Sequence, residues 1–283
     1  MLRGPCFTLI GALGGGILMF PGASSAVESP WADAGQAMVR LLAADPVKAS
    51  GPVYLRGGIE IRIARGWHTY WRYPGDAGVP PRFDWSGSDN LAAIEVRFPA
   101  PERMVEAGGP KIIGYLDSVV FPLRIRPADP ARPVKLRLKL DFAVCEKLCV
   151  PAEVRLEIEV PAGGGAPLSA IEAAEARVPK PMKLGESKGL GVLSVRLERG
   201  KEPRALVEVA VPAGTGFDLF AEGPTEDWAL PLPEKIEAKG GRARFTVPID
   251  GAPPGMKPGS FPAKLKFTLV AGSEAIEVEA PLD

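Results

Sequence analysis

Two cysteines four residues apart, Cys145 and Cys149, carry the side chains best suited to chemistry in this 283-residue chain. Cysteine sulfurs exchange disulfides as thiolates, bind soft metal ions, or close a covalent ring that stiffens a loop. Three kinds of site are therefore open to the pair. The choice among them depends on how the flanking segments place the two sulfurs.

The segments on either side of the cysteines predict a β-hairpin. Residues 134–142 and 154–160 are apolar at every even position, which is the pattern of half-buried strands. Folding the chain back about Lys147 sets apolar residues against apolar residues and Cys145 opposite Cys149. Directly opposed residues in antiparallel strands lie about 4.5–5.5 Å apart at Cα, a separation that a disulfide can bridge.

The position of this pair favours a redox-active disulfide over a structural ring or a metal site. Loop closure over about five residues contributes only about 2 kcal/mol, and a domain of this size can bury a core without a staple. A ring at a hairpin tip is exposed, and exposed disulfides are the exchangeable ones. Both cysteines are odd-numbered, so we expect the sulfurs to point away from the even-numbered apolar face. Lys147 would favour a thiolate and Glu146 would oppose it.

A dense aromatic segment precedes the hairpin. Residues 66–78 read Gly-Trp-His-Thr-Tyr-Trp-Arg-Tyr-Pro-Gly-Asp-Ala-Gly and contain the only histidine. Such rings either fill a sandwich core or line a surface groove. Histidine is the residue type whose ordinary pKa lies nearest to neutral pH. The aspartate stands in a Pro-Gly-Asp turn, where that residue is common for backbone reasons. The candidate supporting residues are His68, Tyr70, Trp71, Tyr73 and Asp76.

Two other functions compete with thiol–disulfide exchange. Cys145, Cys149 and His68 would suit Cu(I), with Met104 or Met182 assisting, provided that the histidine lies near the hairpin tip. A non-catalytic binding module would use the disulfide only to stiffen a loop. A serine hydrolase finds no support, because the sequence has no Gly-x-Ser-x-Gly element. Disulfide exchange itself needs no cofactor.

The first 26 residues predict a signal peptide. Arg3 is followed by an apolar stretch over residues 7–20 and by small residues that end at Ala26, where we expect cleavage. Cys6 would leave with this leader, and export would place the remaining two cysteines in an oxidising compartment. Without Arg3, 33 basic residues face 34 acidic ones, a balance that argues against nucleic-acid binding. No later segment is apolar for long enough to span a membrane.

Short alternating segments, 31 prolines and 33 glycines predict an all-β chain with two immunoglobulin-like β-sandwich domains. We expect a first sandwich over 27–162, a Gly/Pro linker with a short helix over 163–184, and a second sandwich over 185–283.

Several local features refine this organisation. Ala34 to Ala44 suggests a short helix or a lead-in, and Pro122 suggests that 119–125 is an edge strand or a bulge. Ser169 to Arg177 predicts a helix capped by Ser169. Strands of the second sandwich are expected near 190–198, 204–211, 216–221, 242–249, 263–270 and 274–280.

The motifs together resemble a known family. The aromatic segment at 66–78, Phe83-Asp-Trp85, Phe98-Pro-Ala-Pro101 and the unit Cys145-Glu-Lys-Leu-Cys-Val-Pro-Ala152 are similar to the amino-terminal periplasmic domain of DsbD-type protein-disulfide reductases, in particular the ScsB-like branch. The resemblance is strong over about 50–162 and weaker over the second sandwich.

The resemblance implies an immunoglobulin-like fold and electron transfer by disulfide exchange. By position, Cys145 and Cys149 would be the exchanging pair, and Tyr70, Trp71 and Tyr73 are candidates for the aromatic shield found in the family. Full-length members continue into a membrane electron conduit and a thioredoxin-like module, and we expect neither in this chain. We therefore expect a periplasmic protein that exchanges electrons with a separate membrane thiol reductase and with thioredoxin-fold proteins.

Overall fold

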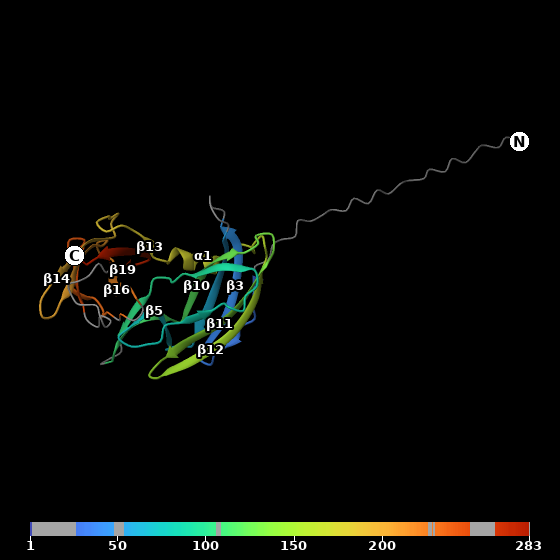
Figure 1. Ribbon diagram of the computed structural model, residues 1–283, viewed down its shortest axis with the longest axis horizontal. Coiled ribbons are helices and arrows are strands. Elements are labelled where there is room, and N and C mark those ends of the chain that lie inside the picture. Colours follow the sequence, from blue (N-terminus) through green and yellow to red (C-terminus); the bar gives the residue numbers. More distant parts are fainter. Residues whose placement is uncertain are drawn as a thin grey trace.

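The computed structural model describes Met1 and residues 27–47, 54–105, 109–225, 228, 230–249 and 264–282. Strands dominate this part of the chain and form two β-sandwiches that lie side by side (Figure 1). No helix within the described ranges has the length and apolar character needed to cross a membrane. The predicted signal peptide, with Arg3 and Cys6, lies outside the described residues apart from Met1.

The first sandwich consists of twelve strands in two sheets. The hairpin sheet has the order β12-β11-β5-β9-β8, with β6 paired to β11, and the opposing sheet has the order β1-β3-β4-β10-β7, with β2 paired to β3. The strands are β1 (Val27–Glu28), β2 (Ala32–Asp33), β3 (Ala37–Val47), β4 (Tyr54–Ile63), β5 (His68–Gly75), β6 (Arg82–Asp84), β7 (Leu91–Val96), β8 (Glu102–Val105), β9 (Lys111–Leu116), β10 (Ser118–Pro127), β11 (Val134–Cys145) and β12 (Cys149–Val160).

The second sandwich has two four-stranded sheets, with orders β13-β20-β19-β16 and β14-β15-β18-β17. Its strands are β13 (Lys180–Pro181), β14 (Gly191–Glu198), β15 (Arg204–Ala210), β16 (Phe217–Glu222), β17 (Glu234–Lys239), β18 (Arg242–Pro248), β19 (Lys264–Ala271) and β20 (Glu274–Pro281). Six of these strands lie where the alternation of apolar residues predicts them. β17 was missed because every residue in it is exposed, so it has no apolar face to detect.

Alternation fixes the core of the first sandwich. The even-numbered residues are buried throughout β11 and from Val154 to Val160 in β12, and they meet Ile59, Ile61 and Phe121 of the opposing sheet in one apolar cluster. The pairing of β11 with β12 joins Val134 to Val160 and continues without a shift to the hairpin tip. The predicted register is confirmed, because any slip would turn the apolar residues of a strand toward solvent.

Two local predictions in the first sandwich are wrong. Ala34 to Ala44 contributes to strand β3 rather than to a helix. Leu41 and Ala43 face the main core, while Leu42 and Ala44 pack against Ile171 on the other face. A strand buried on both faces loses its period-two signal, which explains the ambiguity.

Strand β10 is not an edge strand, because it pairs with β4 on one side and β7 on the other. Pro122 is tolerated there because its carbonyl accepts a hydrogen bond from Arg97, just beyond the last residue of β7. The N–H that proline lacks would point to the same side, at the position where the ladder with β7 ends.

A single helix, α1 (Ser169–Ala176), is found among the described residues and packs against the outer face of the opposing sheet (Figure 1). Its position agrees with the prediction, but the residue at its N-cap is Leu168 and makes no side-chain capping bond. Ser169 is therefore inside the helix rather than its cap. Within the segment predicted as a linker, the Gly165 N–H donates to the carbonyl of Ala44 in β3.

An aromatic cluster at the centre of the first sandwich gives a test of this core. Phe121 is fully buried, and its ring lies 5.1 to 5.9 Å from those of Phe83, Phe98 and Tyr115. We expect Phe121→Ala to lower the free energy of unfolding by about 3–5 kcal/mol, because a large cavity replaces the ring. Urea denaturation measures this change. Val105→Ala, at a side chain that is 65% exposed, is the control and should change stability by less than about 0.5 kcal/mol.

Candidate functional site

The two cysteines form a disulfide at the tip of the hairpin. Cys145 is the last residue of β11 and Cys149 the first of β12, and they are register partners with a Cα–Cα separation of 4.2 Å. This arrangement follows directly from the strand register, as predicted. The three residues between them, including Lys147, are exposed.

The two halves of the disulfide differ in burial. Cys145 is 2% exposed and belongs to a small apolar cluster with Tyr70, Ile112 and Ala143, separate from the main core. Cys149 is exposed. The prediction that the cysteines face away from the main core is confirmed, but the prediction that the ring is exposed is wrong for Cys145. Strand β5 lies beside β11 in the same sheet at this point, and its Tyr70 packs against Cys145 on that face.

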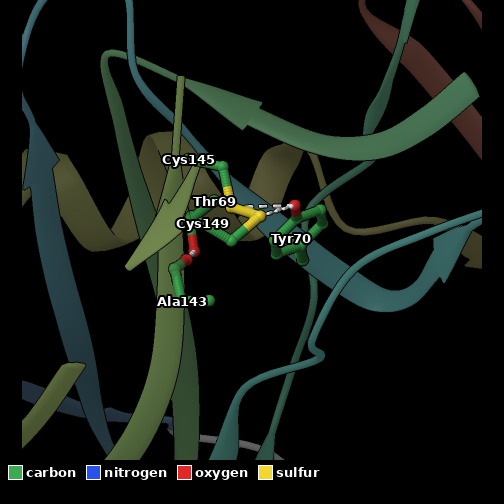
Figure 2. The surroundings of a disulfide bond; sticks show 5 residues. All are labelled: Thr69, Tyr70, Ala143, Cys145 and Cys149. Carbon is green, nitrogen blue, oxygen red and sulfur yellow. Dashed lines mark hydrogen bonds between the residues drawn. A yellow bond between two sulfur atoms is a disulfide. The ribbon is translucent and has the colours of Figure 1, made fainter. Parts of the chain in front are cut away.

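Tyr70 covers the disulfide with its hydroxyl group. The phenolic oxygen lies 2.9 Å from Sγ of Cys145, to which it donates, and 3.1 Å from Sγ of Cys149 (Figure 2). The adjacent Thr69 donates its hydroxyl to the carbonyl of Ala143 at 2.9 Å, which ties β5 to β11. Tyr70 is itself buried, so the phenol is a fixed part of the site rather than a mobile surface group.

Gly78 supports the Tyr70 ring from the other side. A Cβ atom at Gly78 would lie 2.4 and 2.6 Å from two ring carbons of Tyr70, and the backbone there has a φ of +142°. Only glycine fits a backbone that approaches the ring this closely. The Pro-Gly-Asp-Ala-Gly segment therefore packs against the residue that covers the disulfide.

His68 lies next to the disulfide. It is the register partner of Cys145, and its ring meets the Tyr70 ring edge-on with centroids 5.3 Å apart. It is 6% exposed. The structure therefore brings together four of the seven candidate residues: the two cysteines, His68 and Tyr70.

The other three candidates lie elsewhere. Trp71 is fully buried in the main core, since neighbours in a strand face opposite sides of the sheet. Tyr73 donates its hydroxyl to the carbonyl of Leu230 in the second sandwich. Burial and the charges of Asp76 and Glu222 raise the pKa of Tyr73 to about 12. Trp71 and Tyr73 therefore do not shield the cysteines, which corrects the expectation from the resemblance.

Asp76 is an exposed turn residue rather than a neighbour of the thiols. Its carboxylate accepts a hydrogen bond from the backbone N–H of Lys111, and its own N–H donates to the carbonyl of the same residue. These bonds join the turn to the backbone of β9 at Lys111 and do not involve the disulfide.

The residues proposed for copper are only partly assembled. Met104 packs against the cluster that contains Cys145, whereas Met182 packs against the core of the second sandwich. His68 lies in register with Cys145, as a copper site would require. Within the described part of the chain, however, no three His, Cys, Asp or Glu side chains are arranged to hold a metal ion.

The sequence predicts no role for Gly78, Thr69 or Arg72, although all three lie in the aromatic segment at 66–78. A glycine eight residues after the tyrosine whose ring it approaches carries no local sign of that contact. The only available signal was the density of the motif itself, which marks the segment but does not separate the residues that contact the disulfide from those that do not.

The geometry supports charge stabilisation at sulfur. When a disulfide opens, one sulfur leaves as a thiolate, and an O–H donor already in place stabilises that charge. The Tyr70 hydroxyl faces both sulfurs and can serve either one. The site therefore has the parts for a disulfide that opens reversibly.

Comparisons with known proteins agree with this geometry. Residues 39–161 match the family model described as thiol:disulfide interchange protein DsbD, N-terminal. The fold is similar to that in the crystal structure of the N-terminal periplasmic domain of ScsB from Proteus mirabilis, with a TM-score of 0.70 and 20% sequence identity. That likeness covers 91% of this chain and 99% of that chain, so it takes in the second sandwich. No curated protein matches the sequence.

Replacing Tyr70 by phenylalanine isolates the role of the hydroxyl, because the ring remains. We expect dithiothreitol to reduce the disulfide of Tyr70→Phe about tenfold more slowly, since a hydrogen bond to a charged group is worth about 1.5–3 kcal/mol. Thiol release measures the rate. Tyr115→Phe is the matched control, because it removes a buried hydroxyl that donates to Pro99 instead of to sulfur. Equal rates for Tyr70→Phe and the wild type would contradict this assignment.

Proposed function

We propose that this protein relays electrons by thiol–disulfide exchange through a reversible Cys145–Cys149 disulfide, since residues 39–161 match the DsbD N-terminal family model. The relay would run between a membrane thiol reductase and thioredoxin-fold partners. The observation that carries the proposal is the disulfide itself, with one cysteine exposed, the other buried, and a phenol that donates a hydrogen bond to Sγ of Cys145 and lies 3.1 Å from Sγ of Cys149.

The difference in burial suggests an order of events. A thiolate of a reduced dithiol partner attacks Sγ of Cys149, which is the exposed cysteine. The partner–Cys149 bond forms as the Cys145–Cys149 bond breaks, and the electron pair leaves on Sγ of Cys145. Tyr70 donates its hydrogen bond to this new thiolate.

The second half of the exchange releases the partner. The second cysteine of the partner attacks the partner's own sulfur in the mixed disulfide, and Cys149 departs as a thiolate. Two electrons and, after protonation of both thiolates, two protons have then moved from the partner to Cys145 and Cys149. The reverse sequence passes the electrons onward, and neither direction requires a cofactor.

Exposed apolar side chains around Cys149 support a protein partner rather than a small thiol. Leu148 is 80% exposed between the cysteines, and Val150 is 44% exposed directly after Cys149. Leu116 is also exposed and is paired with His68, one strand away from Cys145. Apolar residues gathered beside a reactive group are typical of a docking surface.

The fold and the family support a periplasmic location, in line with the signal peptide expected at residues 1–26. We propose that 27–162 is the exchange module, followed by a connecting segment and the second sandwich. The second sandwich, expected over 185–283, begins earlier, because β13 at Lys180–Pro181 already pairs with β20. The copper alternative is not carried further, since the described residues hold no suitable ligand group. The remaining alternative is a binding module in which the disulfide is only structural.

The reduction potential separates exchange from a structural role. We expect a value well above the roughly −300 mV that limits structural disulfides. Equilibration of the full chain in dithiothreitol redox buffers, with Cys6→Ala as background, measures it. A value below that limit, together with a variant lacking Cys145 and Cys149 that differs only in melting temperature, would show that the disulfide is a scaffold element.

Single-cysteine variants test the order of attack. In the Cys6→Ala background, the remaining thiol of Cys145→Ala should react with Ellman's reagent at least about tenfold faster than that of Cys149→Ala. The reason is that Cys149 is exposed whereas Cys145 is buried under Tyr70. Equal reactivity, or a faster reaction at Cys145, would reverse the proposed order.

A further inference from the structure

Strand β5 loses its regular partner immediately after Tyr70. Its pairing with β9 is regular from His68 to Tyr70, shifts over residues 71–74, and resumes where Gly75 meets Ile112. On its other side, β5 pairs with β11 only at His68 and Thr69. Regular strand pairing within the first sandwich therefore reaches Tyr70 but does not extend over the next four residues, 71–74.

The second sandwich holds this irregular segment instead. Three consecutive residues after Tyr70 contact it: the Trp71 ring lies 5.8 Å from the Phe220 ring, Arg72 binds two carboxylates, and Tyr73 donates to the carbonyl of Leu230. In Figure 1, β5 lies on the side of the first sandwich that faces β16. The strand that covers the disulfide is thus anchored from outside its own sandwich.

Arg72 is the strongest of these anchors. Its guanidinium forms a bidentate pair with Glu222 of β16 through Nε at 2.8 Å and Nη2 at 2.7 Å, and also binds Glu277 of β20. Planar bidentate pairs fix geometry as well as charge. Burial alone would lower the pKa of Arg72, but its bonds and charge interactions with the two glutamates outweigh burial and raise it. The arginine is a permanent cation between two anions of the other sandwich.

We propose that the second sandwich positions Tyr70 over the Cys145–Cys149 disulfide through the Arg72–Glu222–Glu277 cluster, so that Arg72 is a positioning residue for thiol–disulfide exchange. Arg72 lies two residues after Tyr70 in β5. It contacts the second sandwich and acts on the phenol through the backbone of this strand. The inference rests on the proposed function, because it concerns the rate of that exchange. It gives the second sandwich, which has no cysteine of its own, a part in the chemistry.

A second arginine keeps the two sandwiches together when Arg72 is altered. Arg103 of β8 forms a bidentate pair with Asp218 of β16 at 2.7 and 2.9 Å and donates to the carbonyl of Pro233. Loss of Arg72 therefore releases the segment after Tyr70 without removing every tether. The variant should remain folded, and circular dichroism verifies this.

The test is the rate at which dithiothreitol reduces the disulfide of the full chain. We expect Arg72→Leu to slow reduction at least threefold, because a displaced phenol stabilises the leaving thiolate less well. Arg72→Lys keeps the charge and should recover part of the rate. The double change Glu222→Gln with Glu277→Gln, made entirely in the second sandwich, should slow reduction in the same way while leaving β5 unaltered.

A double-mutant cycle shows whether Arg72 acts through Tyr70. If it does, Arg72→Leu added to Tyr70→Phe causes no further slowing, since the hydroxyl is already absent. A structural role would lower the melting temperature but would not produce this dependence. The inference is overturned if Arg72→Leu leaves the rate unchanged or raises it, or if its effect multiplies undiminished with that of Tyr70→Phe.

Arg56→Leu is the matched control. Arg56 is also a partly buried arginine between two carboxylates, with Glu175 at 2.6 Å and Asp45 at 2.7 Å, but it joins β4 to α1 and β3. We expect it to lower stability and to leave the reduction rate within twofold of the wild type. A wild-type reduction potential below the roughly −300 mV that limits structural disulfides would refute the proposed function itself. A reduction potential above that limit, with no coupling between Arg72→Leu and Tyr70→Phe in the double-mutant cycle, would refute only the role of Arg72.

Discussion

The pairing of β11 with β12 in one register is the constraint on which the site depends. Because side chains alternate strictly along a strand, the same register that buries the even-numbered residues in the main core places Cys145 opposite Cys149 on the other face. The fold and the disulfide therefore have a common cause. The disulfide can open without a cavity forming in the main core, because neither cysteine belongs to that cluster.

The packing of Tyr70 from the neighbouring strand β5 makes the two sulfurs of the disulfide unequal. Tyr70 and its neighbours bury Cys145, while Cys149 stays exposed at the start of β12. An attacking thiolate and a leaving thiolate have opposite needs, access for one and stabilisation of charge for the other. The hairpin tip leaves Cys149 accessible to an attacking thiolate, and the Tyr70 hydroxyl stabilises a thiolate that leaves on Cys145. Gly78 lets the loop pack closely against the Tyr70 ring and hold it in place.

Sequence patterns predicted the strands where one face is buried and one is exposed, as in the hairpin and in β18 to β20. They failed where this contrast is missing. Strand β3 is buried on both faces from Leu41 to Ala44, and β17 is exposed throughout. They also failed at Pro122, where proline marks the end of a ladder inside the sheet rather than an edge strand. The rule on proline concerns one missing N–H group, and only the sheet shows which side that group faces.

The sequence by itself determined the register of the hairpin and the apposition of the two cysteines, because both follow from period-two alternation across a short turn. Only the tertiary structure decided which aromatic residue reaches the sulfurs, which cysteine is buried, and what the second sandwich holds. Tyr70 and Cys145 are 75 residues apart, and Arg72 and Glu222 are 150 residues apart. Contacts over such separations leave no local pattern, since they arise from the packing of whole sheets.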